Sequence, residues 1–408
     1  MNSSTLALTA PALPRAATLV LDMLRGLRHG QLALTLPNEA PVLVGKGDTR
    51  AAMRIDNWQV FEQALSRGDI GFAESYIEGA WEAEDLGALL TLLNRNRDVL
   101  KMALYGHWWR LAAYRLRHFL RTNTRTGSRR NIMAHYDLGN EFYKLWLDGT
   151  STYSAALFEG QQGHGRTLEE AQLAKYRRIL QRLQVQAGDH ILEIGCGWGG
   201  FAEVAATEFG CRVTGLTLSP AQLAFASERA QRGGYATQVE FLLRDYRDIS
   251  GQFDAVVSIE MFEAVGERYW PAYFRQVQRS LKPQGRAVIQ AITITHELFG
   301  RYRRGTDFIQ RYIFPGGMLA SPEIFSAQAA DQGLKLVDDL AFGADYAHTL
   351  RLWHQRFVNC REALLALGFD ERFIRMWRFY LAYCEAGFAA GSTNVHQFEL
   401  VRDAASPI

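Results

Sequence analysis

A glycine-rich stretch in the middle of the chain, HILEIGCGWGG at 190–200, has the residue types of a cofactor-binding loop. An apolar run that should form a buried strand carries Glu193 near its end. Three glycines then follow at alternate positions: Gly195, Gly197 and Gly199. Such a loop between a strand and a helix lets the backbone approach a ligand closely at the carboxyl edge of a sheet. When the next glycine is counted, the stretch also contains G-x-G-x-x-G, the dinucleotide-binding pattern.

The position of acidic residues distinguishes between the two kinds of ligand. A dinucleotide fold needs an acid about 20 residues further on, where it binds the ribose. Here the second expected strand ends in GLTLS at 215–219 and carries no acid. The pattern E-x-G-x-G-x-G, with the acid before the glycines, is instead typical of S-adenosylmethionine (SAM) methyltransferases. The glycines would admit the methionine end, and Glu193 would fix the loop or the amino group. Asp245, just after the third expected strand, would meet the adenine amino group. A structural glycine turn and an NAD site stay open as alternatives.

Length and composition indicate a soluble enzyme of two domains. The chain has 408 residues, of which 48% are hydrophobic and 22% charged, as is ordinary for globular proteins. Its four cysteines lack metal-binding spacing and are too sparse for a disulfide framework, so we expect a reducing cytoplasm and no metal site. An apolar run near 16–23 lacks a basic segment and a cleavage site. No stretch has the length of a membrane span.

Three segments differ in pattern along the chain. Residues 1–100 combine short strand-like runs, around Pro37 and Asn38, with helices interrupted by glycines such as Gly68, which predicts a small α+β domain. Residues 101–130 are basic and aromatic. Residues 131–408 should form the catalytic domain, in which strands and helices alternate as in a doubly wound α/β sheet. The strands that we expect there are 190–194, 211–216, 239–243, 255–259, 286–294, 335–341 and 395–401.

Six further motifs occur in a fixed order: HYDLGNEFY (135–143), TYSAALF (152–158), GLTLSPAQ (215–222), SIEMFEAVG (258–266), RYIFPGG (311–317) and FGADY (342–346). With these, the chain resembles the cyclopropane fatty acyl phospholipid synthase family and the related mycolic acid cyclopropane synthases. The resemblance is dense over 131–402 and looser over the first 100 residues. It implies a Rossmann-like SAM methyltransferase sheet with a helical lipid-binding insertion.

The resemblance also implies a reaction. The family moves the sulfonium methyl of SAM onto a cis double bond of a membrane-lipid acyl chain. A carbocation forms, a base removes a proton from the new methyl, and a cyclopropane ring closes. The family's base is a bicarbonate held in a small polar pocket. Two alternatives stay open: an enzyme of the same architecture that leaves a methyl or methylene branch, and a non-catalytic SAM- or lipid-binding protein.

The implied catalytic pocket carries over with two departures. Glu263 and Tyr346 match the family's glutamate and tyrosine, and Ile292 matches an isoleucine that contributes main chain. Gln290 stands where the family has histidine, and Ala155 where it has cysteine. Loss of the imidazole weakens anion binding, so we expect proton removal to suffer more than methyl transfer, which favours the branched product. Cys384 matches a cysteine that the family shares and that is sometimes treated as an active-site residue, but we favour the alternative of a small buried helix residue.

The implied cofactor contacts match the family throughout. Thr217 and Gln222 stand where other methyltransferases keep a ribose-binding acid, which accounts for the absent carboxylate. The full set of expected contacts is Tyr153, Ser154, the loop 191–199 with Glu193, Gly195, Cys196, Gly197 and Gly199, then Thr217, Leu218, Ser219, Gln222, Asp245 and Tyr246.

The substrate implied by the resemblance is an unsaturated phospholipid within a membrane, so part of the protein must dock there. Residues 101–130 contain one lysine, seven arginines and no acid, together with five tryptophan, tyrosine or phenylalanine residues. Such a segment suits the anionic inner face of a membrane and predicts a cytoplasmic protein that associates peripherally. An interdomain helix with solvated or paired arginines is the alternative. We expect no nucleic-acid partner, because no recognition module accompanies the basic residues. The resemblance suggests a homodimer.

Overall fold

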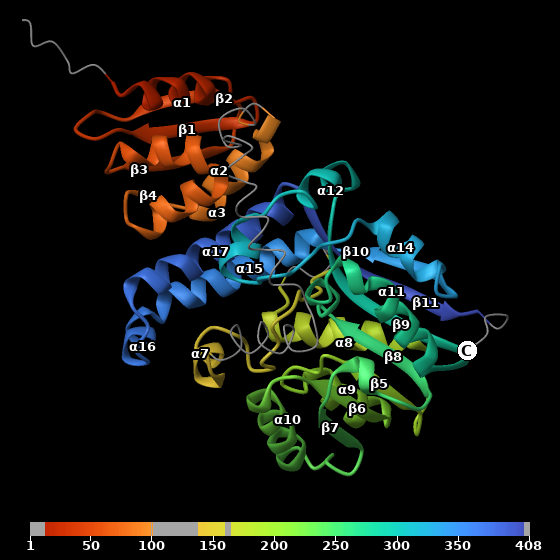
Figure 1. Cartoon of the computed structure of the whole chain (residues 1–408). Helices are drawn as coiled ribbons and strands as arrows, with labels where there is room; N and C mark the ends of the chain where they lie inside the picture. Colours follow the sequence, from red (N-terminus) through yellow and green to blue (C-terminus); the bar gives the residue numbers. More distant parts are fainter. Residues whose placement is uncertain (1–12, 99, 101–137, 160–164, 404–408) are drawn as a thin grey trace, which may run out of the picture. The chain divides into compact units, whose positions relative to one another are not determined.

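The computed structural model describes residues 13–98, 100, 138–159 and 165–403 (Figure 1). The chain divides into two compact units, residues 1–108 and 109–408, each of which is described by itself. The expected domain boundaries at 100 and 130 border on or fall within residues outside the described part. They therefore stay predictions, and so does the membrane contact of 101–130.

In its described residues, the first unit is a four-stranded sheet with three helices. Its strand order is β2-β1-β3-β4, and only the β1–β3 pair is parallel. The expected strands on either side of Pro37 are present, and α2 bends at Gly68, whose φ of +64° is open to glycine. The elements are α1 (Arg15–Arg25), β1 (Gly30–Thr35), β2 (Val42–Lys46), β3 (Arg50–Ile55), α2 (Gln59–Ile77), β4 (Trp81–Ala83) and α3 (Leu86–Arg95).

The second unit is built on a seven-stranded sheet of order β10-β11-β9-β8-β5-β6-β7. Strands β5 to β9 are parallel, whereas β11 runs antiparallel to both β9 and β10. Every expected strand overlaps an observed one, so the doubly wound α/β class is confirmed. The strands are β5 (His190–Ile194), β6 (Arg212–Thr217), β7 (Val239–Leu243), β8 (Phe253–Ile259), β9 (Leu281–Ile294), β10 (Leu334–Ala341) and β11 (Thr393–Arg402).

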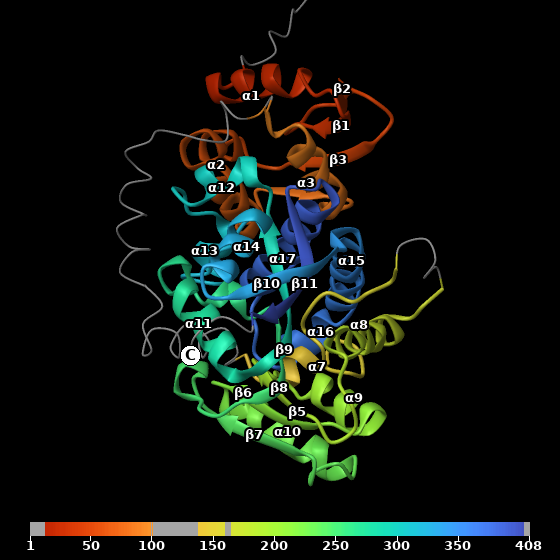
Figure 2. The same cartoon turned by 90° about the vertical axis from the view of Figure 1, so that its right-hand side faces the viewer.

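Helices cover both faces of this sheet (Figures 1 and 2). On one face α8 (Leu168–Leu183) and α9 (Gly200–Phe209) pack against β5, β6 and β8 through Ile179 and Phe201. On the other, α11 (Trp270–Ser280) and α14 (Pro322–Ala330) bury Phe274 and Phe325. The chain order reverses at the adjacent strands β5 and β8, and the crevice at the carboxyl ends of such strands is where α/β sheets bind ligands.

Further helices lie between the last three strands, as expected for a helical insertion. Helices α15 and α17 pack side by side (Figure 1). In the described part of the chain no helix is both long and apolar enough to cross a bilayer. The remaining elements are α7 (Asn140–Lys144), α10 (Pro220–Arg232), the 3₁₀ turns η2 (Tyr246–Asp248), η3 (Phe262–Ala264) and η4 (Glu267–Tyr269), α12 (His296–Tyr302), α13 (Phe308–Tyr312), α15 (Gly343–Asn359), α16 (Arg361–Ala366) and α17 (Glu371–Ala389).

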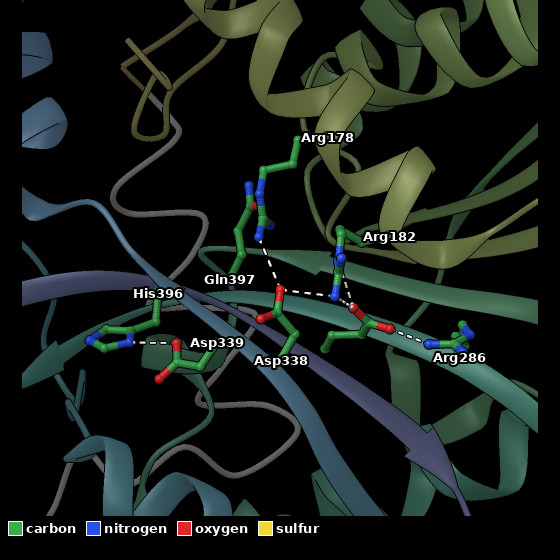
Figure 3. Close-up of polar contacts among 8 residues, drawn as sticks. Arg178, Arg182, Arg286, Asp338, Asp339, His396 and Gln397 are labelled. Atoms are coloured by element: carbon green, nitrogen blue, oxygen red, sulfur yellow. Dashed lines mark hydrogen bonds and ion pairs between the residues drawn. The ribbon is translucent and has the colours of Figure 1, made fainter. Parts of the chain in front are cut away.

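A polar network fastens α8 to the antiparallel end of the sheet (Figure 3). Arg182 pairs with Asp338 at 3.0 Å and with Glu399 at 2.7 Å, and Arg286 pairs with the second oxygen of Glu399. The Glu399 side chain is only 3% exposed, so losing one of these partners would leave a buried charge uncompensated. Arg178 in the same helix pairs with Asp338 at 3.2 Å and donates to Gln397. The network therefore fixes the Gln397 and Glu399 side chains of β11 against α8.

Candidate active site

The glycine loop after β5 adopts backbone angles that residues other than glycine rarely adopt. Gly195, Gly197 and Gly199 have φ values of +89°, +51° and +80°, in the region that favours glycine. A Cβ on Gly195 would lie 3.0 Å from the Met261 side chain, whereas a Cβ on Gly197 would meet nothing within 4 Å. The loop thus packs closely against the segment after β8 on one side and has open space beside Gly197. This arrangement fits a ligand that lies on the loop.

Glu193 is the penultimate residue of β5, just before this loop, and is only 2% exposed. Burial raises the pKa of its carboxyl to about 8, although the nearby Lys175 opposes the rise. Among the described residues its Oε2 meets no hydrogen-bond partner. A buried, unpartnered carboxyl oxygen needs a donor, and the ammonium group at the methionine end of SAM is one. The burial and the open oxygen are compatible with a ligand contact, and the expected role of Glu193 stays a prediction.

The side chains after β6 hold one another in place. Thr217 Oγ1 donates to Gln222 Oε1 at 2.8 Å, and Ser219 caps α10 by accepting from the Gln222 amide at 3.3 Å. Thr217, Ser219 and Gln222 are buried, and Leu218 is half-buried. These contacts make the segment rigid where the sequence places the ribose.

Asp245 and Tyr246 lie after β7, as expected, but Asp245 is engaged within the protein. Its two carboxylate oxygens accept from the Arg247 guanidinium at 2.8 and 2.6 Å, and it caps the 3₁₀ turn η2. Tyr246 is half-buried, and burial raises the pKa of its phenol to about 12. The contact of Asp245 with adenine stays a prediction.

Aromatic rings and a buried lysine surround the segment 152–158. The Tyr153 hydroxyl lies 2.5 Å from that of Tyr380, and its ring centroid lies 5.4 Å from that of Trp353. Ser154 Oγ accepts from Lys175 Nζ at 2.6 Å. Burial lowers the pKa of Lys175 to about 7 despite the acids near it. The face of an aromatic ring attracts a positive charge, so this part of the protein suits a cationic ligand or intermediate.

The residues expected to bind bicarbonate converge on a protein carboxylate, that of Glu260. The Ala155 amide and the Gln290 Nε2 donate to its Oε1, each at 2.7 Å, and the Tyr346 hydroxyl donates to its Oε2 at 2.6 Å. Glu260 follows β8 directly and adopts φ +51°. The sequence did not single out Glu260. The sequence feature that could have indicated Glu260 is a second acid in SIEMFE, three positions before Glu263.

Two tertiary contacts bring the donors to Glu260. Asp345, at the start of α15, accepts from the Phe158 and Glu159 amides at 2.7 and 2.9 Å, which joins this helix to the segment that carries Ala155. On the sheet, Gln290 in β9 is the register partner of Ile259 in β8. The side chains that the sequence predicts for one pocket thus do lie together.

Glu263 lies one turn further on. Its Oε1 accepts from the Ile292 amide, which is the fourth group expected to donate to bicarbonate. Its Oε2 is inaccessible and meets no hydrogen-bond partner among the described residues. Burial, and then the negative charge of Glu260, raise the pKa of Glu263 to about 8. At neutral pH Glu263 therefore holds its proton.

Bicarbonate does not fit the described arrangement. All four groups expected to hold it, on Ala155, Gln290, Ile292 and Tyr346, already donate to the carboxyls of Glu260 or Glu263. A separate anion would have to displace a side chain and would lie against a carboxylate. Repulsion between like charges opposes such binding.

Cys384 lies in α17 close to this site, but its chemistry is unsuited to catalysis. Burial raises the pKa of the thiol well above its usual value. Because the thiolate is the reactive form, a thiol with a raised pKa is a poor nucleophile or base. The position agrees with the alternative of a small packing residue in a helix, and a catalytic role for Cys384 finds no support.

Comparison with known proteins identifies the family of the chain. A family described as mycolic acid cyclopropane synthetase matches residues 123–398. The chain belongs to this family. It is 41% identical over 379 residues to the tuberculostearic acid methyltransferase UfaA1 of Mycobacterium tuberculosis, covering 91% of this chain and 88% of that one. It is 35% identical over 361 residues to the cyclopropane-fatty-acyl-phospholipid synthase of Escherichia coli, covering 86% and 88%.

Solved structures of cyclopropane synthases resemble the second unit. The mycolic acid cyclopropane synthase CmaA1, complexed with SAH and CTAB, is 32% identical with a TM-score of 0.63, covering 67% of this chain and 98% of that one. The cyclopropane synthase MmaA2 from Mycobacterium tuberculosis gives the same TM-score, 0.63, at 31% identity and the same coverage, 67% and 98%. The expected family, the Rossmann-like fold and the SAM-dependent methyltransferase activity are confirmed.

Proposed function

We propose that this cyclopropane synthetase family member transfers the methyl carbon of SAM to a cis double bond of an unsaturated phospholipid acyl chain, where a cyclopropane ring then closes. One observation carries the proposal. Two glutamates, Glu260 and Glu263, lie in the segment whose Met261 packs against the SAM-type glycine loop. A proton acceptor therefore stands beside the methyl donor's expected position, as ring closure requires.

The chemistry divides between the donor and the chain's own residues. SAM supplies an electrophilic methyl carbon, which the electron pair of the double bond attacks, and S-adenosylhomocysteine leaves with the sulfur electron pair. The neighbouring alkene carbon becomes positive. Rings such as Tyr346 and Phe388, whose centroids lie 4.4 Å apart, stabilise that charge and help to exclude water. A carboxylate then takes a proton from the new methyl, and the released C–H electron pair forms the third ring bond.

A branched product is the second candidate. The relative at 41% identity carries the name tuberculostearic acid methyltransferase. The family resemblance implies that Gln290 and Ala155 stand where cyclopropane synthases have histidine and cysteine. If a hydride migrates to the positive carbon before the proton leaves, the same base generates a methylene branch. The ring and the methylene branch both need a proton acceptor, so a glutamate base in the site is compatible with either product.

Phospholipid as the substrate and an anionic membrane surface as the docking site belong to the same proposal. The Escherichia coli relative bears the name of a phospholipid-modifying enzyme. The basic and aromatic segment 101–130, which lies outside the described residues, supplies the composition for peripheral binding at the inner face of a cytoplasmic membrane. Association as a homodimer rests on the family resemblance alone.

The test is expression in bacteria that lack cyclopropane lipids, followed by mass spectrometry of the fatty acids. A gain of one CH₂ with loss of the double bond shows the ring, and the same gain with one double bond retained shows the methylene branch. Absence of any gain, from folded protein that binds SAM, would mean that the protein is a binding protein. For the membrane step, reversing the charges of Arg110, Arg115, Arg117 and Arg121 should abolish sedimentation with anionic liposomes; equal sedimentation would refute the docking role.

A further inference from the structure

We propose that the carboxylate of Glu260 is the base that removes the methyl proton, so that this enzyme needs no dissolved bicarbonate. The inference rests on the proposed function, because it names the proton acceptor of that reaction. Its foundation is geometric: Glu260 receives three hydrogen bonds from groups that the family resemblance assigns to a bound anion. A carboxylate attached to the chain has the same planar pair of oxygens as bicarbonate and occupies its donors.

The donor and acceptor roles along a chain of side chains require a hydrogen-bond acceptor at the position of the Glu260 carboxylate. Arg178 can only donate, so the oxygen of Gln397 faces it. The Gln397 amide nitrogen then donates to Gln290 Oε1 at 3.0 Å, which leaves the Gln290 nitrogen to donate to Glu260 at 2.7 Å. The relay of Arg178, Gln397 and Gln290 therefore directs a donor at Glu260 and favours its ionised form. Figure 3 labels Arg178 and Gln397, the first two residues of this relay.

The backbone of Glu260 supports a dedicated role. A non-glycine residue at φ +51° is uncommon and costs free energy unless its surroundings hold it there. Glycine would adopt this conformation without strain. The chain keeps a glutamate here and holds its main chain by a bond from the Glu260 amide to the Gln290 carbonyl at 2.8 Å. Strain of this kind concentrates at functional positions.

Glu260 has a free acceptor site for the proton, and its neighbours favour the ionised form. A carboxylate offers about four acceptor sites, of which three are used, so one stays open for the substrate's C–H. Burial raises the pKa of Glu260, but its bond from Tyr346 and the charge of Lys175 oppose the rise. In the step itself, a Glu260 oxygen forms an O–H bond with the methyl proton. The C–H electron pair becomes the new carbon–carbon bond, and no further reactant is needed.

The experiment compares wild type with Glu260→Gln and Glu260→Gly in bicarbonate-free and bicarbonate-containing buffer. Turnover is the transfer of methyl from labelled SAM to vesicles of unsaturated phosphatidylglycerol. Binding of ¹³C-bicarbonate, read by NMR without SAM or lipid, is the second measurement. Calorimetry of S-adenosylhomocysteine binding verifies that each variant is folded. Glu208→Gln, which changes a surface carboxylate paired with Arg177, is the matched control and should behave as wild type.

Wild type should turn over equally in both buffers and bind no bicarbonate. Glu260→Gln should lose about 10²–10⁴-fold in turnover, the usual contribution of a general base, without rescue, because the amide still fills the pocket. Glu260→Gly vacates the three donors, so it should bind bicarbonate and regain at least tenfold turnover when the anion is added. Bicarbonate dependence of wild type, near-normal turnover of Glu260→Gln, or a Glu260→Gly variant that neither binds nor is rescued would each overturn the inference.

The two proposals fail differently. If wild type methylates no unsaturated lipid, the proposed function is wrong, but the bicarbonate measurement still tests the pocket. A wild-type protein that binds ¹³C-bicarbonate would overturn the role of Glu260 whatever the lipid product. Anion binding by Glu260→Gly alone would support the replacement of the anion by the side chain.

Discussion

Replacing Glu193 by glutamine should make the stability of the second unit less dependent on pH. The carboxyl is 2% exposed, and its pKa rises from 4.5 to about 8 because burial disfavours the charged form. Below pH 4.5 both folded and unfolded chains hold the proton, so the raised pKa costs nothing. As pH rises toward 8, the unfolded chain releases the proton and the folded chain keeps it, so stability falls.

The size of this effect follows from the shift. A gap of about three and a half pH units at about 1.36 kcal/mol per unit amounts to about 5 kcal/mol at pH 8 and above. Glutamine has no proton to lose, so the variant should gain on wild type as the pH increases. The difference in free energy of unfolding should be below about 1 kcal/mol at pH 5 and should reach about 5 kcal/mol at pH 8.

Thermal unfolding by circular dichroism at pH 5, 6.5 and 8, without ligand, measures the effect. At about 2 °C per kcal/mol for a unit of this size, the variant should melt about 10 °C above wild type at pH 8. Glu208→Gln is the control: it removes a surface ion pair with Arg177, and its difference should not grow toward pH 8. If Glu193→Gln and wild type differ equally at pH 5 and pH 8, the carboxyl is not a buried, protonated group.

Three further outcomes test the site. Gly197→Ala should weaken SAM binding at least tenfold, about 1.4 kcal/mol, whereas Gly234→Ala, equally left-handed and equally free of neighbours within 4 Å, should not; calorimetry decides, and equal affinities would show that no ligand lies on the loop. Tyr346→Phe removes a hydrogen bond that lowers the pKa of Glu260, so the acidic limb of the kcat–pH profile should move to higher pH; an unmoved limb contradicts the contact. Gln397→Met breaks the relay of Arg178, Gln397 and Gln290, so the acidic limb should again move to higher pH. We expect a roughly tenfold lower kcat and an unchanged KM for SAM. A change in KM alone would point to a structural role.

The sequence determined much of this protein because some patterns are local. Apolar runs located all seven strands of the large sheet, and an acid before spaced glycines identified the SAM loop. The glycines could be interpreted because positive φ angles exclude most other residues there, whatever the surroundings. The motifs also selected Ala155, Gln290 and Tyr346 as neighbours, and the structure confirms that they are.

Only the tertiary structure revealed what those neighbours surround. The donors to Glu260 lie 105, 30 and 86 residues away in the chain, and strand pairing and the docking of α15 bring them together. No local pattern shows that the bicarbonate donors are already occupied, or that Glu193 and Glu263 hold their protons. Charge states depend on burial and on nearby charges from distant parts of the chain. These exist only once the chain has folded.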